Sequence, residues 1–300
     1  PALAENRVHL LNSRRFQAGA LIGQMATFIQ EQQAQLNAVA LLEQFAKQVV
    51  APDEIRAVSL QADMADQIQL EYLPANMSTQ FDRTAYYDKL MLGYQPYIEV
   101  LKSCLTADEP ELWVPQVVKT FDDYRILAAI RHGAFGLSQL NQQIEQRLLE
   151  ALALLMSRQG DWYVGRPVMM TYNDYQLGLS NGDIGICFKR SRDGQSQFEV
   201  YFPSLEKWVP ATRLPKSIET AFVLTIHKSQ GSEFTHTAVV LDEAAKKLLS
   251  KELLYTAITR AKKVVSVLAN PEAFVQALTI KSIRKSGVSD KIKHSLNGSS

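Results

Sequence analysis

The sequence predicts an α/β protein in which helices cover a parallel sheet and a small β-rich unit interrupts the chain. Beyond residue 217, apolar segments of strand length alternate with segments of helical spacing, the pattern of a parallel sheet with crossover helices. From Trp162 to Leu214, short β segments alternate with turn signals such as Ser180-Asn181-Gly182-Asp183. Roughly fifty residues of this kind predict a small inserted β-barrel.

The C-terminal elements follow from apolar periodicity. The predicted strands are 221–226, 237–241 and 264–268, and the predicted helices begin at about Ser229 and cover 245–262 and 271–279. In the β-rich unit we expect strands over 168–171, 184–188, 198–202 and 207–209.

The N-terminal half is dominated by helical spacing. We expect helices from Leu21 to about residue 50, over 86–105 and over 138–156, the last with Ser138 as its N-cap. Short strands are expected at 7–11, 57–60 and 125–130.

Composition limits the class of protein. A chain of 300 residues with 46% hydrophobic content can bury a sizeable core and suggests two or three domains. It has no apolar run near 18 residues, which excludes a transmembrane helix. Cys104 and Cys187 form no closely spaced pair, which favours a cytoplasmic protein without a metal site. Because the chain opens on Pro1, without an initiator Met, we interpret it as part of a longer protein.

Charge is distributed unevenly along the chain. Residues 1–160 hold 13 Lys and Arg against 18 Asp and Glu, and residues 161–300 hold 19 against 13. The net charges of −5 and +6 suit a nucleic-acid contact in the second half and protein contacts in the first. Ordinary surface variation explains such an excess equally well.

The most informative segment is Thr225-Ile226-His227-Lys228-Ser229-Gln230-Gly231-Ser232-Glu233-Phe234. It lies where a buried strand is expected to give way to a helix, and backbone N–H groups at such a position bind anions. Thr225, His227, Lys228 and Ser229 are candidate contacts to a DNA backbone. Gln230, Gly231 and Glu233 are candidates for facing a nucleotide. Outside such a motif, a single His at a strand end is more often a structural residue.

A second segment, Leu253-Leu254-Tyr255-Thr256-Ala257-Ile258-Thr259-Arg260-Ala261, ends in an arginine on a predicted helix. Such an arginine can bring a planar charge to a γ-phosphate across a domain interface. The same role is available to Arg15, at the end of the first predicted strand. For either arginine the alternative is a surface salt bridge. The two segments together, about 25 residues apart, are more specific than either alone.

The residues expected to hold most of a nucleotide are absent from the sequence. No Gly-x-x-x-x-Gly-Lys-Ser/Thr phosphate loop occurs in the 300 residues, so half of any nucleotide site must come from elsewhere. Asp242-Glu243 follows an apolar strand, as a Mg²⁺-binding carboxylate pair does, but it comes after the segment that begins at Thr225. We therefore interpret Asp242 and Glu243 as a solvated pair at a strand end.

These segments resemble the RecD family of superfamily 1 helicases, subunits of the bacterial RecBCD exonuclease V. The resemblance runs nearly from end to end and covers the C-terminal half of that family. Further matching segments are Leu11-Asn12-Ser13-Arg14-Arg15-Phe16, Ala128 to Gly136 with Leu140-Asn141, Gly165 to Met170, and Leu177 to Gly185.

The resemblance implies a second RecA-like domain with an inserted Src-homology-3-like (SH3-like) barrel. It divides the chain into a first part of the RecA-like domain with helical segments (1–160), the barrel (161–216), the rest of that domain (217–280) and a disordered Lys/Ser/Gly-rich tail (281–300). Residues 30–115 carry no family motif.

The resemblance also assigns roles to the residues. Arg15 and Arg260 would contact the γ-phosphate of ATP, and Gln230, Gly231 and Glu233 would couple the nucleotide to DNA. Thr225 and His227 would touch single-stranded DNA. ATP and Mg²⁺ would be held mainly by a first RecA-like domain that this sequence lacks, so the chain alone is expected not to hydrolyse ATP. The implied activity is 5′→3′ DNA unwinding in double-strand break repair and recombination.

The implied partners are unwinding DNA and RecB- and RecC-like subunits, with no membrane. The alternative is a non-catalytic module that binds DNA or partner subunits, favoured by the acidic, motif-poor N-terminal half. An independent nuclease lacks support because the sequence shows no Asp/Glu/Lys cluster on adjoining strands.

Overall fold

The computed structural model describes residues 21–31, 37–48, 54–74 and 80–280. The predicted strand at 7–11, Arg15 and the 281–300 tail lie outside these residues. Within them, no helix is long and apolar enough to cross a membrane.

Five parallel strands form the central sheet in the order β1-β10-β9-β2-β8. Their bounds are β1 Gln67–Tyr72, β2 Tyr124–Ala128, β8 Val223–Thr225, β9 Phe234–Leu241 and β10 Ala261–Ala269. This sheet confirms the predicted α/β class with a parallel sheet, and β8, the strand that leads into the Thr225 segment, lies at its edge.

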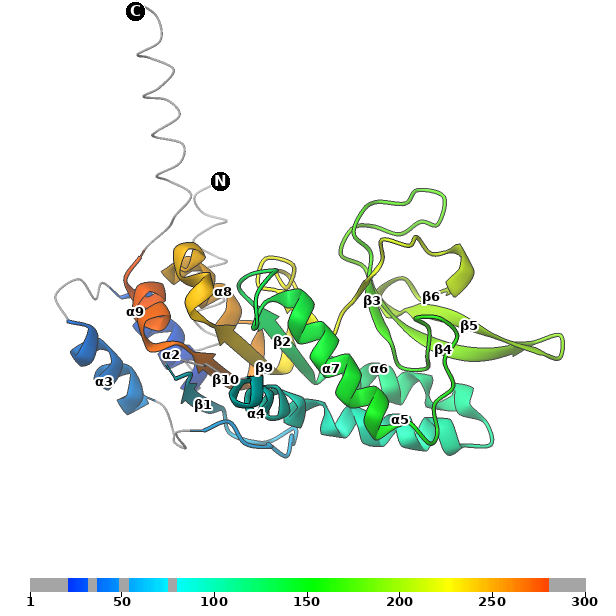
Figure 1. The fold of residues 1–300 in the computed structure, drawn as a ribbon, viewed down its shortest axis with the longest axis horizontal. Helices are drawn as coiled ribbons and strands as arrows, with labels where there is room; N and C mark the ends of the chain where they lie inside the picture. The colour runs from blue at the N-terminus through cyan, green and yellow to red at the C-terminus, as the bar shows by residue number, and fades with distance from the viewer. Residues whose placement is uncertain (1–20, 32–36, 49–53, 75–79, 281–300) are drawn as a thin grey trace, which may run out of the picture.

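Helices cover both faces of the sheet (Figure 1). One layer consists of α2 Leu21–Gln30, α3 Ala38–Gln48, α8 Lys251–Ile258 and α9 Pro271–Thr279. The other consists of α4 Gln80–Met91, α5 Gln95–Thr106, α6 Val114–Asp122 and α7 Leu137–Ala151. Alternate strand residues serve the two layers: Leu127 and Val239 pack under the first, Ile126 and Ala238 under the second. This alternation explains why the buried strands read as continuous apolar runs.

The inserted unit is an antiparallel sheet at one end of the molecule (Figure 1). Its strand order is β6-β5-β4-β3-β7, with bounds β3 Pro167–Met169, β4 Ile184–Arg192, β5 Gln195–Phe202, β6 Lys207–Pro210 and β7 Glu219–Thr220. The ladders leave β6 and β7 at the edges, so a closed SH3-like barrel is not shown and stays a prediction. Because β7 pairs with β3, the sheet extends beyond residue 216.

Two predicted elements do not form, the strand at 57–60 and the helix after Ser229, and one predicted helix differs at its ends. No strand forms at 57–60: just before this segment, the Ile55 and Arg56 amides donate to the side chains of Glu71 and Gln69 instead of to a strand. The helix predicted over 138–156 is confirmed as α7, but it begins at Leu137 with Gly136 and not Ser138 as its N-cap, and it ends at Ala151. No helix follows Ser229; turns occupy 226–231 and lead directly toward β9.

The predicted helix over 86–105 is divided by a 3₁₀ turn at Leu92–Tyr94. The division lets the chain pass close to the sheet, because a Cβ built on Gly93 would stand 2.2 Å from the Tyr124 ring. Only glycine fits there. The predicted helix over 245–262 is likewise two pieces, a 3₁₀ stretch at Glu243–Leu248 and α8.

Candidate functional site

The candidate site begins with β8, whose outer edge has no neighbouring strand among the described residues. The Asn141 side chain on α7 takes that place: its Nδ2 donates to the Val223 carbonyl at 3.2 Å, and its Oδ1 accepts from the Val223 amide at 3.0 Å. The Tyr94 hydroxyl donates to the Phe222 carbonyl. Side chains from the second helical layer therefore fix β8, and with it the position of Thr225.

A compact turn follows Thr225. The Thr225 hydroxyl accepts from the Lys228 amide at 3.2 Å, and the Thr225 carbonyl accepts from the Ser229 amide at 3.1 Å. The Ser229 side chain is 0% exposed, and its hydroxyl donates to the Ile226 carbonyl at 2.6 Å. Ser229 therefore stabilises the turn. It does not face solvent, as a residue that contacts DNA would have to. His227 and Lys228 are exposed.

Lys228 connects this turn to the inserted unit. Its Nζ donates to Asn181 Oδ1 at 2.7 Å. Asn181 belongs to the turn before β4, which is closed by a 2.7 Å bond from the Ser180 amide to Asp183 Oδ2. Predicting this contact would require knowing the fold, because the two residues are 47 positions apart.

The end of the segment carries the residues predicted to face a nucleotide. Gln230, Gly231 and Glu233 are exposed. Gly231 has φ of +82°, a conformation that strains any residue with a side chain, and this permits the chain to reverse toward β9. The structure therefore brings all three together on one turn next to the DNA-facing candidates.

Arg260 lies on the turn between α8 and β10 and contacts this segment directly. Its Nη1 donates to the Ser232 carbonyl at 3.2 Å, and its carbonyl accepts from the Phe234 amide at 2.8 Å. Its Nε donates to the Thr256 carbonyl at 3.0 Å. The two sequence segments thus form one site, and the guanidinium is positioned by backbone oxygens.

Asp242 and Glu243 lie at the other end of β9. Glu243 is exposed, as predicted, whereas Asp242 is half-buried and caps the 3₁₀ stretch that follows. Burial raises the pKa of Asp242, while backbone N–H groups act to lower it. Among the described residues, no group of three or more His, Cys, Asp or Glu is arranged to hold a metal ion.

Comparisons with known proteins identify relatives of this chain. The UvrD-like helicase C-terminal domain family matches residues 220–268. The RecD subunit of the Haemophilus influenzae RecBCD enzyme is 32% identical over 297 residues, 96% of this chain and 41% of that protein. RecD of Mycolicibacterium smegmatis is 34% identical over 59% of this chain and 31% of its own length. The ATP-dependent RecD2 DNA helicase of Deinococcus radiodurans is 29% identical over 46% of this chain and 19% of its own length.

Among solved structures, a Bacteroides Pif1 helicase in complex with ADP-AlF3 and ssDNA aligns with 77% of this chain and 57% of its own, at 16% identity and a TM-score of 0.34. The chain spans less than half the length of the curated relatives that it matches.

Proposed function

This chain is homologous to the RecD subunits of RecBCD enzymes, and we propose that it supplies one side of the ATP cleft and part of the DNA path of a helicase subunit. The complete protein would be an ATP-dependent 5′→3′ DNA helicase of a cytoplasmic RecBCD-type exonuclease V, acting with RecB- and RecC-like subunits in double-strand break repair and recombination. In it, the parallel sheet is a second RecA-like domain and the inserted unit is SH3-like.

One observation carries this proposal: the contact between Arg260 and the Ser232 carbonyl. It connects the arginine that would contact the γ-phosphate of ATP to the segment that would contact the DNA strand. A motor needs such a connection, because the state of the nucleotide must change the grip on DNA. Arg260 is 28 positions from Ser232, so the fold and not the local sequence creates the contact.

On the nucleotide side, the residues of this chain would contact ATP and Mg²⁺ from one side only. Arg260 would offset negative charge near the γ-phosphate, and Gln230 and Glu233 would border the nucleotide. ATP supplies the phosphoryl group whose transfer to water drives translocation. The sequence has no phosphate loop, and the described residues have no carboxylate cluster for Mg²⁺, so these must come from a second domain. Arg15 would join Arg260 from the same side.

On the DNA side, the candidate strand path runs from the Thr225 turn onto the inserted unit. His227 and Lys228 offer donors at the surface, and the Lys228–Asn181 contact leads to a loop that carries Tyr175. Tyr175 is 91% exposed, and an exposed aromatic ring suits base stacking. Thr225 positions the Lys228 backbone. This path would bind phosphates with little sequence preference.

The test of the DNA role is fluorescence anisotropy of a labelled oligo-dT with this chain, over a series of salt concentrations. We expect Lys228→Ala to weaken binding and to reduce the slope of log affinity against log salt by about 0.7, the value for one phosphate contact on a single strand. His227→Ala should also weaken binding. Lys247→Ala, an exposed lysine near the opposite end of β9, is the matched control.

Asn181→Ala separates the charge of Lys228 from its contact, because it removes the acceptor and leaves the ammonium group. Its affinity should be no weaker than that of the unchanged chain. Identical affinity and salt slope for Lys228→Ala would remove the Thr225 turn from the DNA path.

A further inference from the structure

The loop between β2 and α7 lies beside the Thr225 turn, and neither the proposed ATP contacts nor the proposed DNA contacts include it. β2 and β8 are parallel neighbours, and Ala128, the last residue of β2, is paired in register with Thr225. The Ile226 amide also donates to the Ala128 carbonyl at 3.1 Å. Because the carboxyl ends of parallel strands meet at one edge of a sheet, the loop after β2 and the turn after β8 share the edge where such sheets bind ligands.

Each of these two segments places a cation three residues beyond the end of its strand. The cations are Arg131 after β2 and Lys228 after β8, and both are exposed. Exposed histidines, His132 and His227, lie next to them in the chain. The Arg131 carbonyl accepts from the Ser138 amide at 3.1 Å, which fixes the loop to the first turn of α7. Two cations therefore stand at the ends of neighbouring strands, on one edge of the sheet.

The inserted unit contacts both cations through side-chain oxygens. Lys228 Nζ donates to Asn181 Oδ1 at 2.7 Å, and Arg131 Nη2 donates to Glu219 Oε1 at 2.5 Å. Glu219 belongs to β7, the edge strand that leads into β8. The side chains of Arg131 and Glu219 are 49% and 32% exposed, so water reaches this ion pair. Lys228 is held by a neutral amide, whereas Arg131 is held by a full negative charge.

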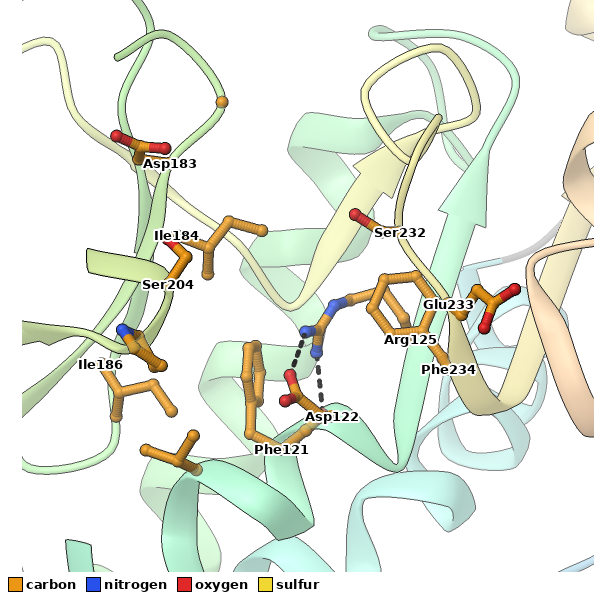
Figure 2. Close-up of a pocket in the computed structure, with 13 residues that line it drawn as sticks. Phe121, Asp122, Arg125, Asp183, Ile184, Ile186, Ser204, Ser232, Glu233 and Phe234 are labelled. Atoms are coloured by element: carbon orange, nitrogen blue, oxygen red, sulfur yellow. Dashed lines mark hydrogen bonds and ion pairs between the residues drawn. The ribbon is translucent and has the colours of Figure 1, made fainter. Parts of the chain in front are cut away.

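The boundary between the inserted unit and the parallel-sheet domain is not tightly packed beside the Lys228–Asn181 contact. A cavity of about 310 Å³ lies there, with Asp183 on the wall formed by the inserted unit and Ser232 on the opposite wall (Figure 2). Asp183 follows Asn181 by two positions, so the cavity adjoins the contact. Polar side chains at this boundary can therefore exchange partners without opening a close-packed core.

The Arg131–Glu219 ion pair is suited to such an exchange. An ion pair that water reaches contributes little to stability, because both charges are well solvated when they separate. One hydrogen bond joins the two side chains. A phosphodiester can offer the planar guanidinium two oxygens, and its binding also releases counterions from the nucleic acid. A DNA phosphate is therefore a stronger partner for Arg131 than Glu219 is.

We propose that Arg131 is a phosphate-binding residue of the DNA path and that the Glu219 carboxylate occupies it until DNA displaces it. This inference rests on the proposed DNA role of the Thr225 turn, to which it adds a second strand end and a contact that competes with DNA. The DNA backbone would then cross the ends of both β8 and β2. Removing Glu219 should tighten DNA binding, which is the opposite of what the loss of a DNA contact does.

The test is fluorescence anisotropy of a labelled oligo-dT with the 300-residue chain and three variants: Glu219→Gln, Arg131→Ala and the two combined. Glu219→Gln should bind about two- to fivefold more tightly, the range expected for releasing an exposed ion pair. The same substitution should have a smaller effect when Arg131 is already alanine, since no guanidinium is then released. In the Glu219→Gln background, Arg131→Ala should reduce the slope of log affinity against log salt by about 0.7, the value for one phosphate contact.

Glu272→Gln is the matched control. It removes the same charge and releases Lys246 from an exposed ion pair of 3.1 Å, but it lies on α9, away from β2 and β8. Its affinity for oligo-dT should equal that of the unchanged chain. The melting temperature of each variant, compared with that of the unchanged chain, separates a change in binding from a change in folding.

Three results would overturn the proposal. Unchanged or weaker binding by Glu219→Gln would mean that the carboxylate does not compete with DNA. Equal gains from Glu219→Gln with and without Arg131 would mean that Glu219 acts through its charge alone. If ATP at constant ionic strength displaces oligo-dT from Glu219→Gln more readily than from the unchanged chain, Arg131 binds a nucleotide phosphate instead of the DNA strand.

The comparison with Lys228→Ala distinguishes this proposal from the proposed DNA role on which it rests. Weaker binding by Lys228→Ala with no change in Glu219→Gln would keep the Thr225 turn in the DNA path and remove Arg131 from it. No change in either variant would remove both strand ends from the path.

Discussion

At the residue scale, Arg260 has a structural and a proposed chemical role. Its side chain donates to the Thr256 and Ser232 carbonyls and to the Thr259 hydroxyl, so its removal also loosens the turn before β10. A loss of activity must therefore be separated from a loss of folding. Lysine retains the charge but lacks the planar fork, which makes Arg260→Lys the informative companion to Arg260→Ala.

In the proposed full-length helicase, Arg260→Ala should lower DNA-stimulated ATP turnover by about 10³- to 10⁵-fold, the loss expected for an arginine finger. Affinity for single-stranded DNA should change little, because the exposed DNA-facing groups remain. Arg260→Lys should be nearly as inactive while melting closer to the unchanged protein. Near-normal turnover in Arg260→Ala would remove this residue from the nucleotide site.

His236 should make stability depend on pH. It is buried on β9, its Nε2 lies 2.8 Å from the Ser266 hydroxyl, and burial lowers its pKa to about 3. Below pH 6.5 the unfolded chain binds a proton that the folded chain excludes, so the free energy of unfolding falls as pH drops toward 3. Between pH 6.5 and 5 the loss due to His236 should be about 1.5 kcal/mol.

The measurement is urea unfolding of the unchanged chain and of His236→Gln at both pH values. The difference between the two chains isolates His236, because the carboxyl groups with raised pKa, Asp122 and Asp242, are present in both. In His236→Gln, the free energy of unfolding should not show the part of its fall with pH that is due to His236. Parallel pH curves for the two chains would mean that His236 titrates normally in the folded state.

At the element scale, sequence patterns predicted the elements whose periodicity is strong. The predicted helix over 271–279 coincides with α9, and the predicted strands 237–241 and 264–268 lie inside β9 and β10. Buried parallel strands produce apolar runs that are easily recognised. The helix expected after Ser229 failed because few residues separate β8 from β9, and Gly231 at positive φ reverses the chain.

The candidate site was predicted less completely than the fold. The two motifs located the surface, and their spacing indicated that they act together. The contacts that build the site were not visible, because Arg260–Ser232, Lys228–Asn181 and Asn141–Val223 join residues 28, 47 and 82 positions apart. The burial of Ser229 could not be predicted from the sequence either, because its hydroxyl donates to the Ile226 carbonyl in a turn specific to this fold.

The two hydrogen bonds between the Asn141 side chain and Val223 should contribute strongly to the stability of β8. Asn141→Leu leaves the amide and carbonyl of Val223 without partners at the edge of the sheet, and should lower the free energy of unfolding by about 2–3 kcal/mol. Gln142→Leu, on the exposed side of α7, should stay within about 0.5 kcal/mol. Both substitutions are measured by urea unfolding. If they lower the free energy of unfolding equally, the Asn141 side chain does not stabilise β8.

At the scale of the whole molecule, one hydrophobic core joins the second helical layer to the inserted unit. It runs without interruption from Leu101 and Phe121 in the helices to Cys187, Val200 and Phe202 in the antiparallel sheet. The Tyr97 hydroxyl also donates to the Gly165 carbonyl at 2.7 Å across this boundary. We therefore expect the unit to unfold with the domain beside it.

The two cysteines can test this cooperativity. Both are buried, and burial raises the pKa of Cys104 and brings that of Cys187 to about 12, so neither should react with Ellman's reagent in the folded chain. In Cys104→Ala and Cys187→Ala, the remaining thiol should become reactive at the same urea concentration. Earlier labelling of Cys187 would show that the inserted unit opens independently.

The contact between Arg260 and Ser232 has a consequence for how the proposed motor transmits force. A displacement of the guanidinium pulls on the backbone between Gly231 and Phe234, the same short stretch whose other end is the turn at Thr225. The signal crosses a single hydrogen bond and a few covalent bonds, with no relay through packed side chains. Substitutions deep in the core should then change the stability of the protein, but not the number of nucleotides translocated for each ATP hydrolysed.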